Sequence, residues 1–75
     1  MKVGKFYKLT ERIWSPCEAL IQPGAIVIGC RQFPSNTSLR GIIIHPKNQS
    51  GMEIQIYKGV AKRIKRRKVL KRLSR

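Results

Sequence analysis

Acidic residues are nearly absent from this sequence. It has no aspartate and three glutamates, Glu11, Glu18 and Glu53, against 17 lysines and arginines, and its formal net charge is +14. General acid–base catalysis needs a positioned carboxylate or imidazole. The glutamates and the one histidine, His45, are isolated from one another in the sequence. We therefore expect no catalytic residues and no enzymatic activity.

Metal-binding and phosphate-loop motifs are also missing. The two cysteines, Cys17 and Cys30, do not form a Cys-x-x-Cys pair, and with His45 they are too few for a four-ligand zinc site. No glycine-rich phosphate-binding loop is present. The sequence predicts no metal site, no cofactor, no small-molecule substrate and no disulfide framework.

The sequence contains no long hydrophobic run. The longest ones, at 25–28 and 42–44, are far shorter than the roughly 20 apolar residues that span a bilayer. Lys2, Lys5 and Lys8 interrupt the N-terminal segment, which argues against a secretory signal. We expect no integral membrane association and a cytoplasmic protein with reduced thiols. Association with the nucleoid or the ribosome fits this expectation, as does a nuclear location in a eukaryotic cell.

Positive charge is concentrated at one end of the chain. Residues 58–75 carry ten lysines or arginines and no acidic residue, with the highest density in KRIKRRK at 62–68. Neighbouring cations repel one another, and phosphates relieve this repulsion while releasing condensed counterions. Polyanion binding is the favoured interpretation. A solubilising or targeting tail, including a nuclear address, and docking into an acidic protein groove are the alternatives.

Short apolar segments between turn residues predict β-strands. Residues 2–14 are strand-like, with Tyr7 and Leu9 on the more apolar parity. A Pro-Gly turn at 23–24 precedes the continuous apolar run 25–30, which is typical of a strand buried on both faces. A third strand is expected at 40–44, and polar connections are expected at 32–38 and 47–51.

The clearest alternation of apolar and polar residues lies at 52–57, where Met52, Ile54 and Ile56 share one parity. Lys58-Gly59 then fits a tight hairpin turn, with 60–64 as the returning strand.

Two helical segments are considered. Ser15, Pro16 and Glu18 match a capping box that would open one or two helical turns through Ile21, the alternative being an extended segment. At the basic end, one amphipathic helix over 60–73 fails because its apolar residues fall on opposite faces. A strand to about position 64, a basic connector and a short helical turn fit better. Val69, Leu70 and Leu73 would anchor that turn.

These elements predict a mainly β fold, a small SH3-like or OB-like barrel of about five strands with a short helical turn and a basic C-terminal segment. The domain would span 1–64, with 65–75 packed on it or extending from it. Pro23-Gly24, the apolar strand at 26–28 and Gly41 before 42–44 resemble the KOW-type arrangement of SH3-like barrels. The resemblance covers about a third of the chain. The loop 31–39 is longer than that family's usual connection and lacks its glycine and lysine, so no site is based on it.

The favoured function is nucleic-acid binding, to RNA or DNA, through backbone phosphates. Aromatic side chains would serve as base-stacking platforms, with Phe33 and Tyr57 as candidates and Trp14 and Phe6 assigned to the core. The alternative function is an SH3-like protein–protein adaptor that docks an acidic partner surface. The predicted contact residues are Lys58, Lys62, Arg63, Lys65, Arg66, Arg67, Lys68, Lys71, Arg72, Arg31, Arg40, Phe33 and Tyr57.

Overall fold

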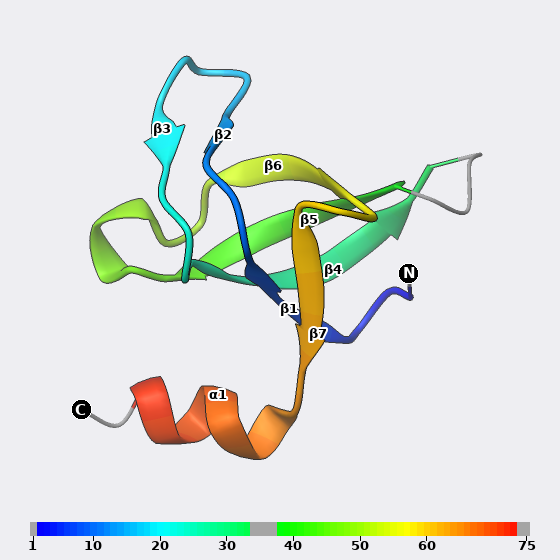
Figure 1. Ribbon diagram of the computed structural model, residues 1–75, viewed down its shortest axis with the longest axis vertical. Helices are drawn as coiled ribbons and strands as arrows, with labels where there is room; N and C mark the ends of the chain where they lie inside the picture. Colours follow the sequence, from blue (N-terminus) through cyan, green and yellow to red (C-terminus); the bar gives the residue numbers. More distant parts are fainter. Residues whose placement is uncertain (1, 34–37, 74–75) are drawn as a thin grey trace.

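The structure is a computed structural model that describes residues 2–33 and 38–73, with the backbone alone for the last two of these. Nine short elements follow one another along this part of the chain (Figure 1). They are β1 (Phe6–Leu9), β2 (Ile13–Trp14), β3 (Leu20–Ile21), β4 (Ile26–Gln32), β5 (Ser38–His45), the 3-10 helix η1 (Lys47–Gln49), β6 (Glu53–Tyr57), β7 (Ala61–Ile64) and α1 (Arg66–Leu73).

The main sheet has five antiparallel strands in the order β6-β5-β4-β1-β7, and β2 and β3 form a separate two-stranded ribbon. β4, β5 and β6 follow one another as a meander. The first strand, β1, lies on the far side of β4, and the last strand, β7, pairs with β1.

The two edge strands of this sheet, β6 and β7, are joined by residues 58–60 alone. From Tyr57 to Ala61 an extended chain reaches at most about 14 Å, at ~3.6 Å per residue. In a flat sheet, four strand spacings of about 4.8 Å would separate these edges by about 19 Å. The sheet must therefore curl, and its two edges approach each other where β6 ends and β7 begins.

The concave face of the curled sheet holds the main core. Tyr7 and Leu9 point into it from β1, as the sequence pattern predicts, and Ile54 and Ile56 point into it from β6. The remaining members come from β4, β5, the small ribbon and the turn before β4: Ile13, Ile21, Ala25, Val27, Leu39 and Ile43.

A second buried apolar position lies on the convex face, at Ile26. Ile26 pairs with Lys8 of β1, so its side chain leaves β4 on the face opposite to Val27, yet it is fully buried. Val69 of α1 is also fully buried and, like Ile26, lies outside the concave core. The helix therefore covers part of the convex face, and the prediction that β4 is buried on both faces is confirmed around Ile26 and Val27. Leu70, expected as an anchor, is instead 54% exposed. The side chain of Leu73 lies outside the described residues.

Two glycines face each other across β4 and β5 and allow the tight curl. A Cβ on Gly41 would meet the side chain of Val27 and lie 3.0 Å from the carbonyl oxygen of Ile28. A Cβ on Gly29 would collide with Leu39 of the concave core. Any larger residue at these positions would therefore force the core or the strands apart.

The predicted capping box does not start a helix. Ser15 accepts a hydrogen bond at its Oγ from the Ala19 N–H (3.1 Å), but it closes a turn in which Glu18 has a positive φ of 63°. Leu20 and Ile21 then pair with Trp14 and Ile13, so the extended alternative is correct. The segment is too short to gain a helix's own hydrogen bonds, and pairing with β2 buries Ile21 instead.

The predicted hairpin between 52–57 and 60–64 is also wrong. The turn exists, with the Val60 N–H donating to the Tyr57 carbonyl (3.1 Å) and Gly59 at φ 106°. After this turn the chain crosses from one edge of the curled sheet to the other, and β7 pairs with β1 rather than with β6. Pairing there extends the sheet and places Ala61 opposite the buried Leu9.

The molecule is thus mainly β, a curled five-stranded antiparallel sheet that forms a half-barrel, with one short helix. This agrees with the expected small β-barrel at the level of architecture. Within the described residues, α1 and η1 are both too short to pass through a membrane.

We expect Gly41→Ala to lower the free energy of unfolding by about 1–3 kcal/mol, because the added methyl group overpacks the junction of β4 and β5. Urea unfolding followed by circular dichroism measures this. Gln55→Ala, an exposed change on the neighbouring β6, is the control and should stay within about 0.5 kcal/mol of the wild type. Equal stability of the two variants would contradict the crowding argument.

Candidate functional site

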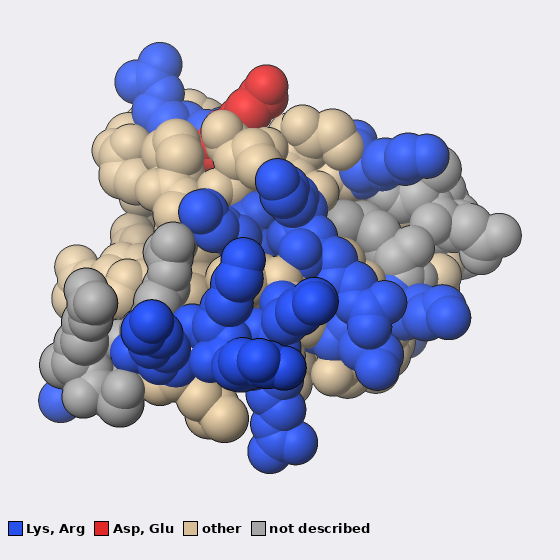
Figure 2. Space-filling model, turned by 60° about the horizontal axis from the view of Figure 1, so that its bottom comes forward, with Lys and Arg blue, Asp and Glu red and all other residues tan. Residues whose placement is uncertain are grey.

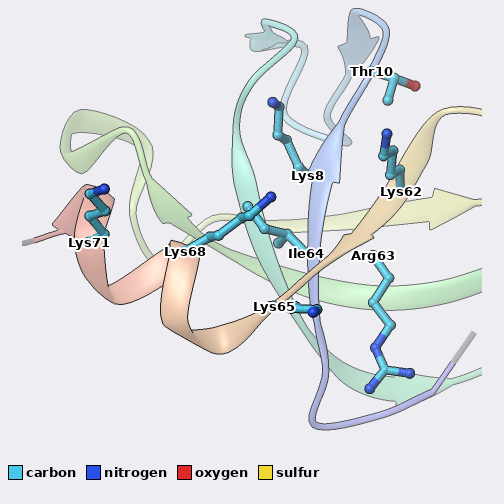
Figure 3. A pocket seen from close by; sticks show the side chains of 8 residues that line it. All are labelled: Lys8, Thr10, Lys62, Arg63, Ile64, Lys65, Lys68 and Lys71. Atoms are coloured by element: carbon cyan, nitrogen blue, oxygen red, sulfur yellow. The ribbon is translucent and has the colours of Figure 1, made fainter.

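A basic groove lies between α1 and the convex face of β1 and β7 (Figure 3). It encloses about 730 Å³. The residues that line the basic groove are Lys8, Thr10, Lys62, Arg63, Ile64, Lys65, Lys68 and Lys71.

Three elements bring these lysines together. Lys8 and Lys62 lie directly opposite each other in the β1–β7 pair, on the face turned away from the core. Lys68 and Lys71 are three residues apart on α1, a spacing that places both on one side of a helix. Figure 3 shows the Lys68 side chain extending from α1 toward β1. Lys65, between β7 and α1, completes the set.

A second hollow adjoins the basic groove at the beginning of α1. It encloses about 680 Å³ and shares Arg63, Ile64 and Lys65 with the groove. Phe6 pairs with Ile28 on one side and Ile64 on the other, so three apolar side chains stand side by side on the convex face. This apolar-floored hollow is lined by Gly4, Lys5, Phe6, Ile28, Arg63, Ile64, Lys65 and Arg66.

The charge around both hollows has one sign. Neither lining includes an acidic residue. Figure 2 shows lysine and arginine side chains gathered over one face of the molecule, with acidic atoms only at its far edge. Glu53 lies on β6, at the opposite edge of the sheet from β7, and is paired with Arg40, at 3.5 Å between Oε2 and Nη1. Close cations without carboxylates among them favour a polyanionic partner.

The helix adds to this electrostatic strain. Its first turn contains Arg66, Arg67 and Lys68 and no acidic residue. The N-terminal end of a helix carries a partial positive charge, so cations there are unfavourable. An anion bound beside this turn would offset both the dipole and the side-chain charges.

The structure brings together most of the basic residues that the sequence singles out. Lys62, Arg63, Lys65, Lys68 and Lys71 line the basic groove, and Arg66 lines the apolar-floored hollow. Arg67 is exposed on α1. The side chain of Arg72 lies outside the described residues.

The other predicted contact residues lie elsewhere. Lys58 is in the turn after β6, and Tyr57, at the end of β6, is 47% exposed. Arg31 and Arg40 are neighbours across β4 and β5, and the Arg40 guanidinium lies 5.6 Å from the Phe33 ring centre. None of these five residues lines either hollow.

Sequence reasoning missed Lys5, Phe6, Lys8 and Thr10, which come from β1 and its flanks. The signal for Lys8 was its parity, opposite to Tyr7 and Leu9. That parity shows that Lys8 leaves the core face, but only the long-range pairing with β7 places it beside Lys62.

The prediction that Trp14 and Phe6 lie in the core is wrong. Trp14 is 70% exposed, and Phe6 is half-buried on the convex face, outside the core cluster. Ile13 and Ile21, paired across the small ribbon, point into the core, so their neighbours Trp14 and Leu20 leave the ribbon on the other face.

Neither a protein-family model, nor a curated protein, nor a solved structure matches this chain. In the described ranges no three His, Cys, Asp or Glu side chains gather where they could hold a metal ion, and Cys17 and Cys30 are free and exposed. The two hollows are therefore the structural features that bear on function.

We expect Lys62→Gln to stabilise the protein at low salt, because it removes a like charge directly opposite Lys8. Such cross-strand pairs are worth about 0.2–1 kcal/mol. Urea unfolding at low ionic strength should show the gain, and about 0.5 M salt should reduce it by screening. Arg12→Gln, an exposed change that lines neither hollow, should give a smaller gain. A larger gain for Arg12→Gln would show that net charge, not this pair, sets the effect.

Proposed function

We propose that this protein binds nucleic acid and that the basic groove holds the backbone phosphates. The observation that carries the proposal is the groove itself. It gathers lysines from β1, β7 and α1 around one open space whose lining has no acidic residue. Holding these cations together costs stability, and a phosphate backbone offsets that cost while releasing counterions.

The residue types favour phosphate over an acidic protein surface. Five of the eight lining residues are lysines. Lysine is a compact point charge that suits phosphate oxygens, whereas protein–protein interfaces are depleted in lysine and enriched in aromatic residues and arginine. The adaptor function is therefore the weaker alternative. A nucleic-acid ligand also implies a cytoplasmic protein, associated with ribosomes or the nucleoid, or a nuclear one in a eukaryote.

For the fold, we propose an SH3-like barrel rather than an OB-like one. The order of the strands supports this choice: β1 lies beside β4, the first strand of the three-stranded meander, and the last strand, β7, lies beside β1. The long connection from β1 to β4, which carries the β2–β3 ribbon, supports it as well. In this arrangement the convex face of β1 and β7 stays open to a ligand.

The test replaces three groove lysines from three elements with glutamine: Lys8, Lys62 and Lys68. The matched control, Lys2→Gln, Arg12→Gln and Lys47→Gln, removes the same charge from exposed positions that line neither hollow. Binding is measured by fluorescence anisotropy with labelled single- and double-stranded RNA and DNA at several salt concentrations.

The groove variant should bind at least about tenfold more weakly than the control. Its salt slope should fall by about 2–3, since each lost phosphate contact removes about 0.7–0.9. Circular dichroism should be unchanged in both. Equal losses in the two variants would mean that generic charge binds the probe, and weak binding independent of nucleic-acid form would direct the search to acidic proteins.

A further inference from the structure

We infer that the apolar-floored hollow binds one nucleobase that has left the stack of its neighbours, with the face of the base lying on the Phe6 ring. The preferred ligand is therefore single-stranded. This rests on the proposed function and names its substrate class. The hollow combines two chemistries: Phe6, Ile28 and Ile64 form its apolar floor, and cationic residues stand around them.

An apolar floor with cations around it matches a nucleotide better than an apolar surface or a cationic surface alone. A nucleobase presents a flat apolar face, and its phosphate is an anion a short distance away. Aromatic platforms beside cationic tracks are how many proteins bind single strands without reading sequence. About 680 Å³ is within the usual range of small-molecule sites, roughly 300–1,000 Å³.

Continuity with the basic groove gives the strand its path. Arg63, Ile64 and Lys65 belong to both linings, so the two hollows meet along the connection from β7 to α1. A backbone held by the groove lysines therefore passes the mouth of the apolar-floored hollow. In a duplex the base faces are covered by their neighbours, so only an unpaired strand can place a base inside.

The packing of α1 explains why Phe6 remains available. Val69 is the fully buried one among the described side chains of the helix, and Ile26, on the convex face of β4, is also fully buried. Phe6 and Ile28 are only partly buried and line the hollow beside the start of α1. Helix packing closes one end of the convex face and leaves the aromatic end open.

The other aromatic residues fit this role less well. The Phe33 ring already has the Arg40 guanidinium at 5.6 Å. Trp14 and Tyr57 are exposed but line neither hollow. Phe6 is the aromatic residue in the linings, and it neighbours the basic groove.

The main test uses Phe6→Leu, which keeps an apolar side chain but removes the aromatic face. The probes are a labelled single strand of about ten nucleotides, within the usual site size of small barrels, and an abasic strand with the same number of phosphates. Trp14→Leu is the matched control, because it removes an exposed aromatic ring outside the hollow. Phe6→Tyr restores a ring.

The wild type should bind the natural strand at least about fivefold more tightly than the abasic one, the lower end of a single stacking contact. Phe6→Leu should remove this preference without changing abasic binding, while Phe6→Tyr and Trp14→Leu should keep it. A wild type without the preference, or a Phe6→Leu variant that keeps it, overturns the inference. The proposed function fails separately if the groove variant and its charge control bind the abasic strand with equal affinity.

A second measurement covers the case in which Phe6→Leu does not fold. The wild-type protein is cross-linked by ultraviolet light to a single strand containing 5-iodouracil, and the adduct is located by mass spectrometry. An adduct at Phe6 supports the inference. An adduct confined to Phe33, Tyr57 or Trp14 overturns it.

Discussion

The pairing of β7 with β1 is the constraint on which the rest of this structure depends. It requires the sheet to curl until its edges can be joined by residues 58–60, and the facing glycines Gly29 and Gly41 leave room for that curl. The pairing also determines the functional face. It brings Lys62 opposite Lys8 and Ile64 opposite Phe6, and it directs α1 onto the convex side. Without it, the basic C-terminal segment would have no groove to line.

The fold and the proposed ligand site make opposite demands on the two faces of the same sheet. The concave core is made of aliphatic side chains and Tyr7, and among the described residues no charged side chain is buried, as a small core requires. The convex face collects lysines from three elements, where each charge repels the next. A small domain has little stability to spare. This arrangement fits the general trade-off between stability and function, in which binding residues are retained at a cost to the fold.

Local patterns in the sequence predicted much of the fold. The alternation at 52–57 identified the buried Ile54 and Ile56, and the helical-face test separated β7 from α1 near the observed boundary. The hairpin error concerns a long-range partner. The turn at Lys58-Gly59 suggested a hairpin because its local chemistry is the same whether the chain returns to β6 or crosses to β1.

Part of the candidate site was also visible in local sequence patterns, and part was not. A run of cations is visible in any sequence, so the groove lysines from Lys62 onward were predicted. Lys8 and Phe6 were not, because their place beside that run is created by strand pairing across more than fifty residues. Phe33 and Tyr57 appeared suitable for stacking from their polar surroundings, yet neither lies at the basic groove.

Among the described side chains of α1, Val69 alone is buried, and this has a thermodynamic consequence. From position 66 to 71 every residue except Val69 is exposed. Burial of one valine contributes only about 1.5–3 kcal/mol, against the repulsion among the helix's own cations. Attachment of the helix and occupation of the groove are therefore linked equilibria, because an anion that binds only the attached form stabilises it by mass action. The ligand would help to build one wall of its own site.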